Sequence, residues 1–170
     1  MTAAIHSGDV QLSAAQVDDL VNRCAASLRA SGVQPGDAVA VMLRNEARWP
    51  VLLKAVRHIG AYAVPLNWHF RAQEAGAILR DCGAVMLFIH DDLLAQLQPA
   101  VPPATGVVRL AMPEALKTDY ALGTASVPDA GTSWDDWLLP QADPVPPHPP
   151  RSSMSYTSGT TGQPKGVRRE

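Results

Sequence analysis

The stretch Ala38-Val-Ala-Val-Met-Leu43 is a continuous apolar run that directly follows the segment Gln34-Pro-Gly-Asp37. Proline at the second position and glycine at the third position of that segment favour a type II turn. A short apolar run that begins at a turn is typical of a strand buried on both faces, and burial on both faces is characteristic of a parallel sheet. We therefore predict a central parallel strand over residues 38–43.

The segments on both sides of this strand alternate between helical and strand patterns. Ser13 and Gln16 have the spacing of a capping box, and apolar residues then follow at helical spacing as far as Gly32. Asn45 is expected to cap a helix that runs to about Ile59. Further strands are expected over 61–66 and 84–89, with helices over 72–81 and 92–97. This alternation predicts an α/β fold with a largely parallel sheet and flanking helices.

The composition of the chain changes at Pro99. Eleven of the fifteen prolines fall between residues 99 and 150. Within this region 107–112 favours a strand and 134–139 a short docking helix, while the remainder favours an extended surface connection. We expect three segments: an α/β subdomain over 1–98, a proline-rich connection over 99–150, and a strand with a phosphate-binding loop over 151–170. All three are expected to belong to one incomplete domain.

The overall composition excludes several classes of protein. A formal net charge of −2 in 170 residues does not favour a nucleic-acid-binding protein, which usually has a basic face. No apolar run approaches the length of a transmembrane helix, and the N-terminus has no signal-peptide pattern. Cys24 and Cys82 lie far apart without metal-site spacing, and Cys24 falls on the apolar stripe of its helix. We expect a cytoplasmic protein with two reduced thiols.

The segment Tyr156-Thr-Ser-Gly-Thr-Thr-Gly-Gln-Pro-Lys-Gly-Val167 contains hydroxyl side chains, glycines and one lysine. Glycines allow backbone N–H groups to approach an anion, hydroxyls add hydrogen-bond donors, and a lysine adds a compact positive charge. This combination is suited to binding a polyphosphate. The candidate phosphate-binding residues are Thr157, Ser158, Gly159, Thr160, Thr161, Gly162 and Lys165.

Other glycine-rich loops fit this segment less well. The Walker A loop has the pattern G-x-x-x-x-G-K-[ST] and opens a helix. Pro164 stands where that pattern has its second glycine, and Gly166 stands where it has Ser or Thr. Because Pro-Lys-Gly does not favour a helix, we expect a hairpin that leads out of a strand over 153–156 and returns as a strand through Val167. The dinucleotide pattern G-x-G-x-x-G is absent, and a simple Ser/Thr/Gly linker has no need for the tyrosine, the Pro-Lys pair and the valine at its ends.

The segment 156–167 resembles the phosphate loop of the adenylate-forming superfamily, which includes acyl-CoA synthetases, nonribosomal adenylation domains and luciferases. Weaker similarity lies in 32–37, in Arg44-Asn45, in 60–67 and in 81–84. The resemblance covers about residues 10–98 and 151–169. Within the superfamily, Pro65-Leu-Asn-Trp68 is more similar to acyl-CoA synthetases than to amino-acid-activating domains.

The resemblance implies an ATP-dependent acyl-CoA synthetase. In that reaction a carboxylate and ATP give acyl-adenylate and pyrophosphate, and coenzyme A then takes the acyl group as a thioester. The implied ligands are ATP, Mg²⁺, coenzyme A and a carboxylic acid. By position, the implied donors to the β- and γ-phosphates are Thr157, Ser158, Thr160 and Thr161, while Gly159 and Gly162 allow backbone approach and Lys165 supplies charge. No catalytic residue and no metal ligand is identified.

The parts that the family places after this loop have no counterpart in the 170 residues. They are the adenine pocket, a magnesium-binding glutamate, a ribose-binding aspartate and a C-terminal lid. We therefore expect the N-terminal part of a longer ligase, inactive alone, with an exposed sheet edge that permits self-association. The alternative is a stand-alone, non-catalytic remnant that binds a nucleotide or a partner. Trp68-His69-Phe70 is interpreted as a packing elbow more readily than as a ligand contact, and the five histidines as surface or structural residues.

Overall fold

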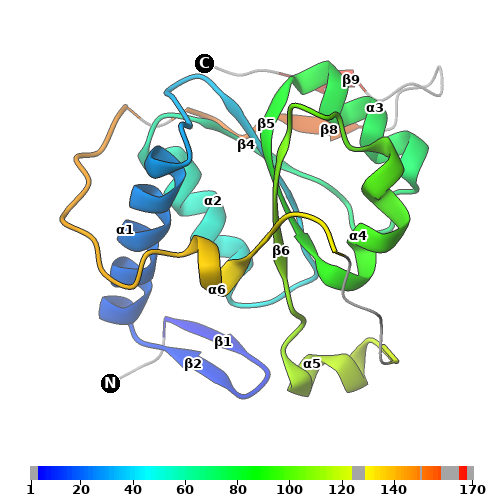
Figure 1. The fold of residues 1–170 in the computed structure, drawn as a ribbon. Helices are drawn as coiled ribbons and strands as arrows, with labels where there is room; N and C mark the ends of the chain where they lie inside the picture. Colours follow the sequence, from blue (N-terminus) through cyan, green and yellow to red (C-terminus); the bar gives the residue numbers. More distant parts are fainter. Residues whose placement is uncertain (1–3, 124–128, 150, 158–164, 168–170) are drawn as a thin grey trace.

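The computed structural model describes residues 4–123, 129–149, 151–157 and 165–167. Its main element is a five-stranded parallel sheet with the strand order β4-β3-β5-β6-β7 (Figure 1). The strands are β3 (Ala38–Met42), β4 (Tyr62–Pro65), β5 (Ala84–His90), β6 (Gly106–Leu110) and β7 (Thr132–Ser133). The predicted α/β class with a largely parallel sheet is confirmed.

Helices cover both faces of this sheet. One face packs against α1 (Ala14–Ala30), α2 (Arg48–His58) and the short α6 (Trp134–Trp137), and the other against α3 (Ala72–Cys82) and α4 (Asp91–Leu97). Alternate residues of β3 belong to the two core clusters, so that all five of its residues are buried. This two-sided burial is the arrangement that the apolar run over 38–43 predicted.

Local sequence signals set several of the helix ends. At the start of α1, the N–H of Ser13 donates to Gln16 Oε1 at 2.9 Å and the N–H of Gln16 donates to Ser13 Oγ at 3.3 Å, which confirms the capping box. At the end of α3, Gly83 adopts the left-handed conformation with φ 62°. Cys24 is fully buried on α1, as predicted, and burial raises the pKa of its thiol to about 12.

The prediction that Asn45 caps α2 is wrong. The helix begins at Arg48, its N-cap position is Ala47, and no side chain caps it there. The carboxylate of Glu46 instead accepts a hydrogen bond from the backbone N–H of Arg48 at 2.9 Å. Pro50 lies in the first turn, where a missing N–H has no cost. The cap is therefore supplied by a neighbouring side chain that also belongs to a buried charge cluster.

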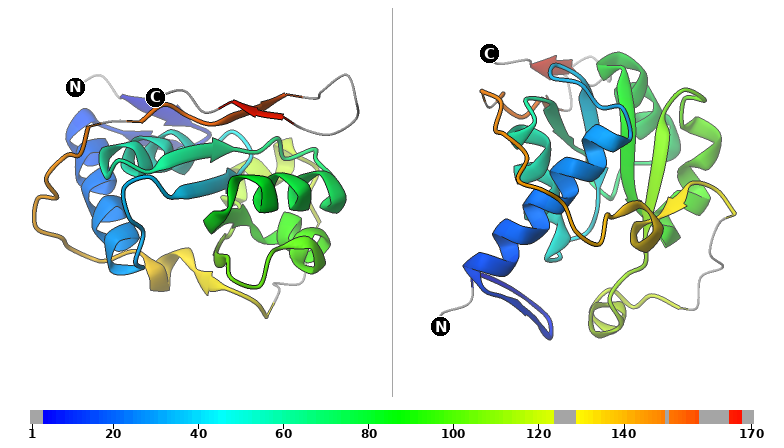
Figure 2. Two further views of the ribbon diagram at one scale, coloured as in Figure 1. Left: turned by 90° about the horizontal axis from the view of Figure 1, so that it is seen from above. Right: turned by 60° about the vertical axis from the view of Figure 1, so that its left-hand side comes forward.

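The proline-rich region contributes to the main sheet as well as connecting its parts. The strand expected over 107–112 forms as β6, and the expected docking helix forms as α6. Residues 138–149, here called the strap, then pass along the outside of α1 (Figure 2). Arg23 Nε donates to the carbonyl of Leu139 at 2.8 Å, and Asn22 Nδ2 donates to the carbonyl of Ala142 at 3.2 Å. The division of the chain into segments at residues 98 and 150 stays a prediction.

The remaining elements are short. They are the antiparallel hairpin of β1 (Ile5–Ser7) and β2 (Val10–Leu12), the 3-10 turn η1 (Gln98–Ala100), α5 (Glu114–Asp119), and the antiparallel pair β8 (Ser155–Thr157) and β9 (Lys165–Val167). Within the described ranges, no helix combines the length and the apolar character needed to cross a membrane.

Gly131 provides a test of how firmly the proline-rich region is docked on the sheet. The backbone of Gly131 has a φ of 75°. A Cβ atom added to Gly131 would lie 2.7 Å from the backbone carbonyl oxygen of Val107. Gly36 has a similar φ of 95° but has nothing within 4 Å of the added Cβ. Gly36→Ala is expected to cost about 1–2 kcal/mol of unfolding free energy through backbone strain alone. Gly131→Ala is expected to cost about 1–3 kcal/mol more, because β7 must move away from β6.

Urea titration of the two variants measures this difference. Equal losses of unfolding free energy in Gly131→Ala and Gly36→Ala would show that β7 is not held against β6 as described.

Candidate functional site

The predicted phosphate loop lies between two paired strands. Residues of β8 and β9 pair antiparallel in the register Ser155 to Val167, Tyr156 to Gly166 and Thr157 to Lys165. The predicted hairpin is therefore confirmed at its two arms, and Thr157 and Lys165 lie opposite each other at the ends of those arms. The other candidates, Ser158, Gly159, Thr160, Thr161 and Gly162, lie outside the described residues.

The segment directly before the strand that leads into the loop is fixed to the edge of the main sheet. Arg151 donates from a guanidinium N–H to the hydroxyl of Tyr62 at 2.9 Å, with its guanidinium carbon 5.2 Å from the centre of the Tyr62 ring. Met154 is 2% exposed, and its backbone N–H donates to the carbonyl of Ala63 at 2.9 Å. Tyr62 and Ala63 both belong to β4. These contacts tie the approach to the loop to the hydrophobic core.

A further contact holds β8 itself. The hydroxyl of Tyr156 donates to Asp81 Oδ2 at 2.6 Å and lies 3.7 Å from Met154 Sδ. Asp81 belongs to the last turn of α3. The segment before the hairpin thus contacts the edge strand of the sheet, and the hairpin itself contacts a helix on one face of the sheet.

A second group of polar residues lies at the carboxyl ends of β3 and β5, the edge at which ligands bind in open α/β sheets. Arg44 Nη2 lies 2.7 Å from Asp92 Oδ2, and the backbone N–H of Arg44 donates to His90 Nδ1 at 3.2 Å. Arg48 Nε lies 2.7 Å from Glu46 Oε1, and His90 Nε2 lies 3.6 Å from the same oxygen. Charged groups of opposite sign, which follow the two central strands, are therefore paired at this edge of the sheet.

The surroundings of Glu46 favour its charged form. Burial alone would raise the pKa of its carboxyl group, since only 2% of the side chain is exposed. Three neighbours lower the pKa: the ring of His90, the charge of Arg48 and the backbone N–H of Arg48. Together they outweigh the effect of burial, so that the pKa of Glu46 lies below its ordinary value of 4.5. At neutral pH Glu46 is therefore a buried carboxylate that contacts Arg48 of α2 and His90 of β5.

Aromatic side chains enclose the guanidinium group of Arg44. Its central carbon lies 4.9 Å from the ring centre of Trp68 and 5.4 Å from that of Tyr120, and the two rings meet edge to face. Trp68 also stacks on His69, with ring centres 3.5 Å apart. Trp68 thus has the packing role expected of it, and Arg44 is only 5% exposed.

This group of polar residues was not predicted from the sequence. The signal that could have found it is the position of Arg44 and Glu46 directly after an apolar strand, and of His90 and Asp92 after the next central strand. Within the residues that the structure describes, no three His, Cys, Asp or Glu side chains are placed to hold a metal ion.

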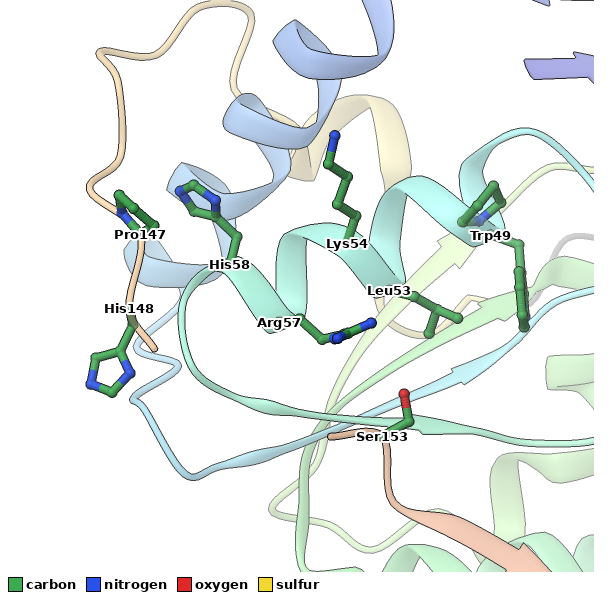
Figure 3. A pocket seen from close by; sticks show the side chains of 9 residues that line it. Trp49, Leu53, Lys54, Arg57, His58, Pro147, His148 and Ser153 are labelled. Carbon is green, nitrogen blue, oxygen red and sulfur yellow. The ribbon is translucent and has the colours of Figure 1, made fainter. Parts of the chain in front are cut away.

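A groove of about 430 Å³ lies between α2 and the end of the strap, and Ser153, which precedes β8, also lines it (Figure 3). Its sides combine apolar Trp49 and Leu53 with the basic side chains of Lys54 and Arg57. Its described lining also includes Pro50, His58, Pro147 and His148. The described lining of the groove thus combines apolar and basic side chains of α2 with the end of the strap.

Glu46→Gln tests the buried charge group. A lowered folded pKa means that the carboxylate stabilises the fold above its unfolded pKa, and that this contribution disappears as the pH falls through the folded pKa. We expect Glu46→Gln to lose on the order of 2–3 kcal/mol of unfolding free energy at neutral pH. The difference from wild type should shrink steadily below the ordinary pKa of 4.5.

Denaturant titrations at neutral pH and at a series of acid pH values measure this effect. Glu114→Gln is the matched control, because the side chain of Glu114 is 85% exposed and its pair with Lys117 contributes little. A loss of stability in Glu46→Gln that does not change with pH would contradict the assignment of a buried, charged carboxylate.

Comparison with known proteins identifies the family. The chain matches the AMP-binding enzyme family over residues 1–170. It is 36% identical over 148 residues to the fatty acid–[acyl-carrier-protein] ligase ScoC of Streptomyces coeruleorubidus, an alignment that covers 86% of this chain and 25% of ScoC. It is 35% identical over 173 residues to the 3-[(3aS,4S,7aS)-7a-methyl-1,5-dioxo-octahydro-1H-inden-4-yl]propanoyl:CoA ligase of Mycobacterium tuberculosis, covering 96% of this chain and 32% of that ligase.

Solved structures agree with this result. The anthranilate CoA ligase AuaEII in complex with anthranoyl-AMP matches with a TM-score of 0.81 and 25% identity, over 98% of this chain and 31% of that one. Acetoacetyl-CoA synthetase from Streptomyces lividans matches with a TM-score of 0.77 and 26% identity, over 94% of this chain and 25% of that one. The chain thus spans about a quarter to a third of the length of these proteins. It belongs to the AMP-binding enzyme family, and it has the fold of part of the N-terminal domain of an adenylate-forming enzyme.

Proposed function

We propose that this chain is the ATP-phosphate-binding N-terminal part of an acyl-CoA synthetase. The observation that carries the proposal is the motif over 156–167 in a chain of the AMP-binding family, with Thr157 and Lys165 opposite each other at the ends of two paired strands. In the proposed reaction a carboxylate oxygen attacks the α-phosphorus of ATP and the bond to pyrophosphate breaks. The sulfur of coenzyme A then attacks the acyl carbon, and AMP leaves.

The proposed role of the loop is to stabilise the departing pyrophosphate. Negative charge accumulates on the β- and γ-phosphates as the bond to the α-phosphorus breaks, and donors that are already in place lower the energy of that state. Thr157, Ser158, Thr160 and Thr161 would donate to phosphate oxygens, Gly159 and Gly162 would allow the backbone to approach, and Lys165 would supply positive charge. Each such charge-assisted hydrogen bond contributes about 1.5–3 kcal/mol before the cost of ordering the loop.

Coenzyme A is the proposed thiol acceptor. The names of several relatives specify a CoA ligase, including those of Mycobacterium tuberculosis and Aromatoleum aromaticum, whereas the name of ScoC specifies an acyl carrier protein. The segment Pro65-Leu-Asn-Trp68 also favours a CoA-dependent enzyme. Mg²⁺ is proposed as a companion of ATP, because Mg²⁺ is commonly held by substrate phosphates together with one or two carboxylates.

The alternative is a stand-alone remnant that binds a nucleotide or a partner without catalysis. Two further properties belong to the same set of proposals: a cytoplasmic location and self-association through a sheet edge. The edge strand β4 is engaged at Ala63 by the backbone of Met154. The large apolar side chains that are exposed in the described part of the chain are Val10 and Leu139.

The 170 residues alone are expected to release no pyrophosphate from ATP in the presence of carboxylic acids.

Lys165→Ala in the ligase that carries this chain tests the proposed role of the loop. We expect carboxylate-dependent exchange of pyrophosphate into ATP to fall by about tenfold or more, because removal of one charge-assisted contact raises the barrier by about 1.5–3 kcal/mol. The Michaelis constant for the carboxylic acid is expected to stay near its wild-type value.

Lys54→Ala is the matched control, since Lys54 lies on α2 in an exposed pair with Asp18. Exchange that is equally fast in the Lys165→Ala and Lys54→Ala variants would remove Lys165 from the mechanism.

A further inference from the structure

We propose that the hydrogen bond between Tyr156 and Asp81 is a positioning contact that holds the leading strand of the phosphate loop against the C-terminal end of α3. The hydroxyl of Tyr156 donates to Asp81 Oδ2 at 2.6 Å across a separation of 75 residues in the chain. Tyr156 pairs with Gly166 of β9, so that it lies in the middle of the two arms of the hairpin. A contact at this point acts on both arms of the loop. The inference rests on the proposed phosphate-binding role of that loop.

The position of Asp81 is not explained by the stability of its own helix. Asp81 is in the last turn of α3, where the partial negative charge of the helix end disfavours a carboxylate. The side chain has no ion-pair partner in the described part of the chain, and the residue is exposed to solvent. The contact that the structure gives this carboxylate is the hydroxyl of Tyr156. A short hydrogen bond to an ionised acceptor is among the stronger polar contacts in proteins.

The other two anchors of the leading strand have a different character. Arg151 binds Tyr62 and the backbone of Met154 binds Ala63, both on the edge strand β4. Met154 is buried in the core, so that its loss would disturb folding as well as the loop. Tyr156 lies two residues before Ser158 and bonds to an exposed residue. Its hydroxyl is therefore the anchor whose removal should disturb the loop without unfolding the protein.

Amide hydrogen exchange on the 170-residue chain tests the contact without any need for enzymatic activity. We expect Tyr156→Phe to speed exchange of the amides of 155–157 and 165–167 by about tenfold, the loss expected for a hydrogen bond to a charged acceptor. Asp81→Ala is expected to have the same effect. Asp81→Asn is expected to keep most of the protection, because the amide oxygen of asparagine still accepts a hydrogen bond.

Tyr120→Phe is the matched control. Tyr120 packs on Trp68 and Arg44 and directly follows α5, which lies at the other end of the molecule from β8 and β9 (Figure 1). Amides of the main sheet and the thermal midpoint are expected to change little in every one of these variants. Unchanged exchange of the two arms in Tyr156→Phe would overturn the proposal. Faster exchange of the amides throughout the main sheet would also overturn the proposal, because the hydrogen bond would then stabilise the whole fold. Exchange of the two arms that is as fast in Asp81→Asn as in Asp81→Ala would overturn it as well.

The same variants in the complete ligase link the contact to function. We expect Tyr156→Phe to raise the Michaelis constant for ATP by about tenfold, with that for the carboxylic acid unchanged and with rescue in Asp81→Asn relative to Asp81→Ala. An unchanged constant for ATP in Tyr156→Phe would overturn the functional part of the inference. If the wild-type ligase itself fails to exchange pyrophosphate into ATP, the proposed function fails, while the hydrogen-exchange result still decides whether the contact orders the hairpin.

Discussion

Burial of β3 and β5 on both faces is the constraint on which the rest of the structure depends. Parallel strands need a crossover connection between them, and here the crossovers supply the helices that cover both faces of the sheet. Because every strand runs in the same direction, all the carboxyl ends meet at one edge. The polar residues that follow β3 and β5 are therefore brought together by the topology, and their opposite charges compensate one another where water is excluded.

The phosphate-loop hairpin stands outside this sheet but is positioned by it. Its leading strand is held by the edge strand β4 through Tyr62 and Ala63, and by the end of α3 through Asp81. A glycine-rich loop binds an anion in a defined arrangement more readily when its ends are fixed, because ordering a loop costs conformational entropy. Attachment to two rigid elements reduces that cost. The core thus contributes to the proposed phosphate binding although none of its residues is expected to touch a phosphate.

Much of the fold was predictable because its signals are local. The capping box at Ser13, the glycine stop at Gly83 and the apolar run of β3 each lie within a few neighbouring residues. Contacts between distant segments left no such signal: β7 is two residues long and exists only through its pairing with β6, and Tyr156 meets Asp81 across 75 residues. Asn45 was predicted as a helix cap on residue type alone, whereas the structure gives that role to Glu46, a member of the buried charge group.

For the candidate site, the two arms of the hairpin are confirmed, and the roles of the loop residues rest on resemblance to the family. The central claim is that these residues form part of a longer adenylate-forming ligase. The intact mass of the endogenous protein that carries these N-terminal peptides tests this most directly. Since the chain spans 25% to 32% of the ligases it matches, we expect a species roughly three to four times heavier than 18.1 kDa. A natural species of 18.1 kDa would contradict it and would favour a stand-alone binding protein.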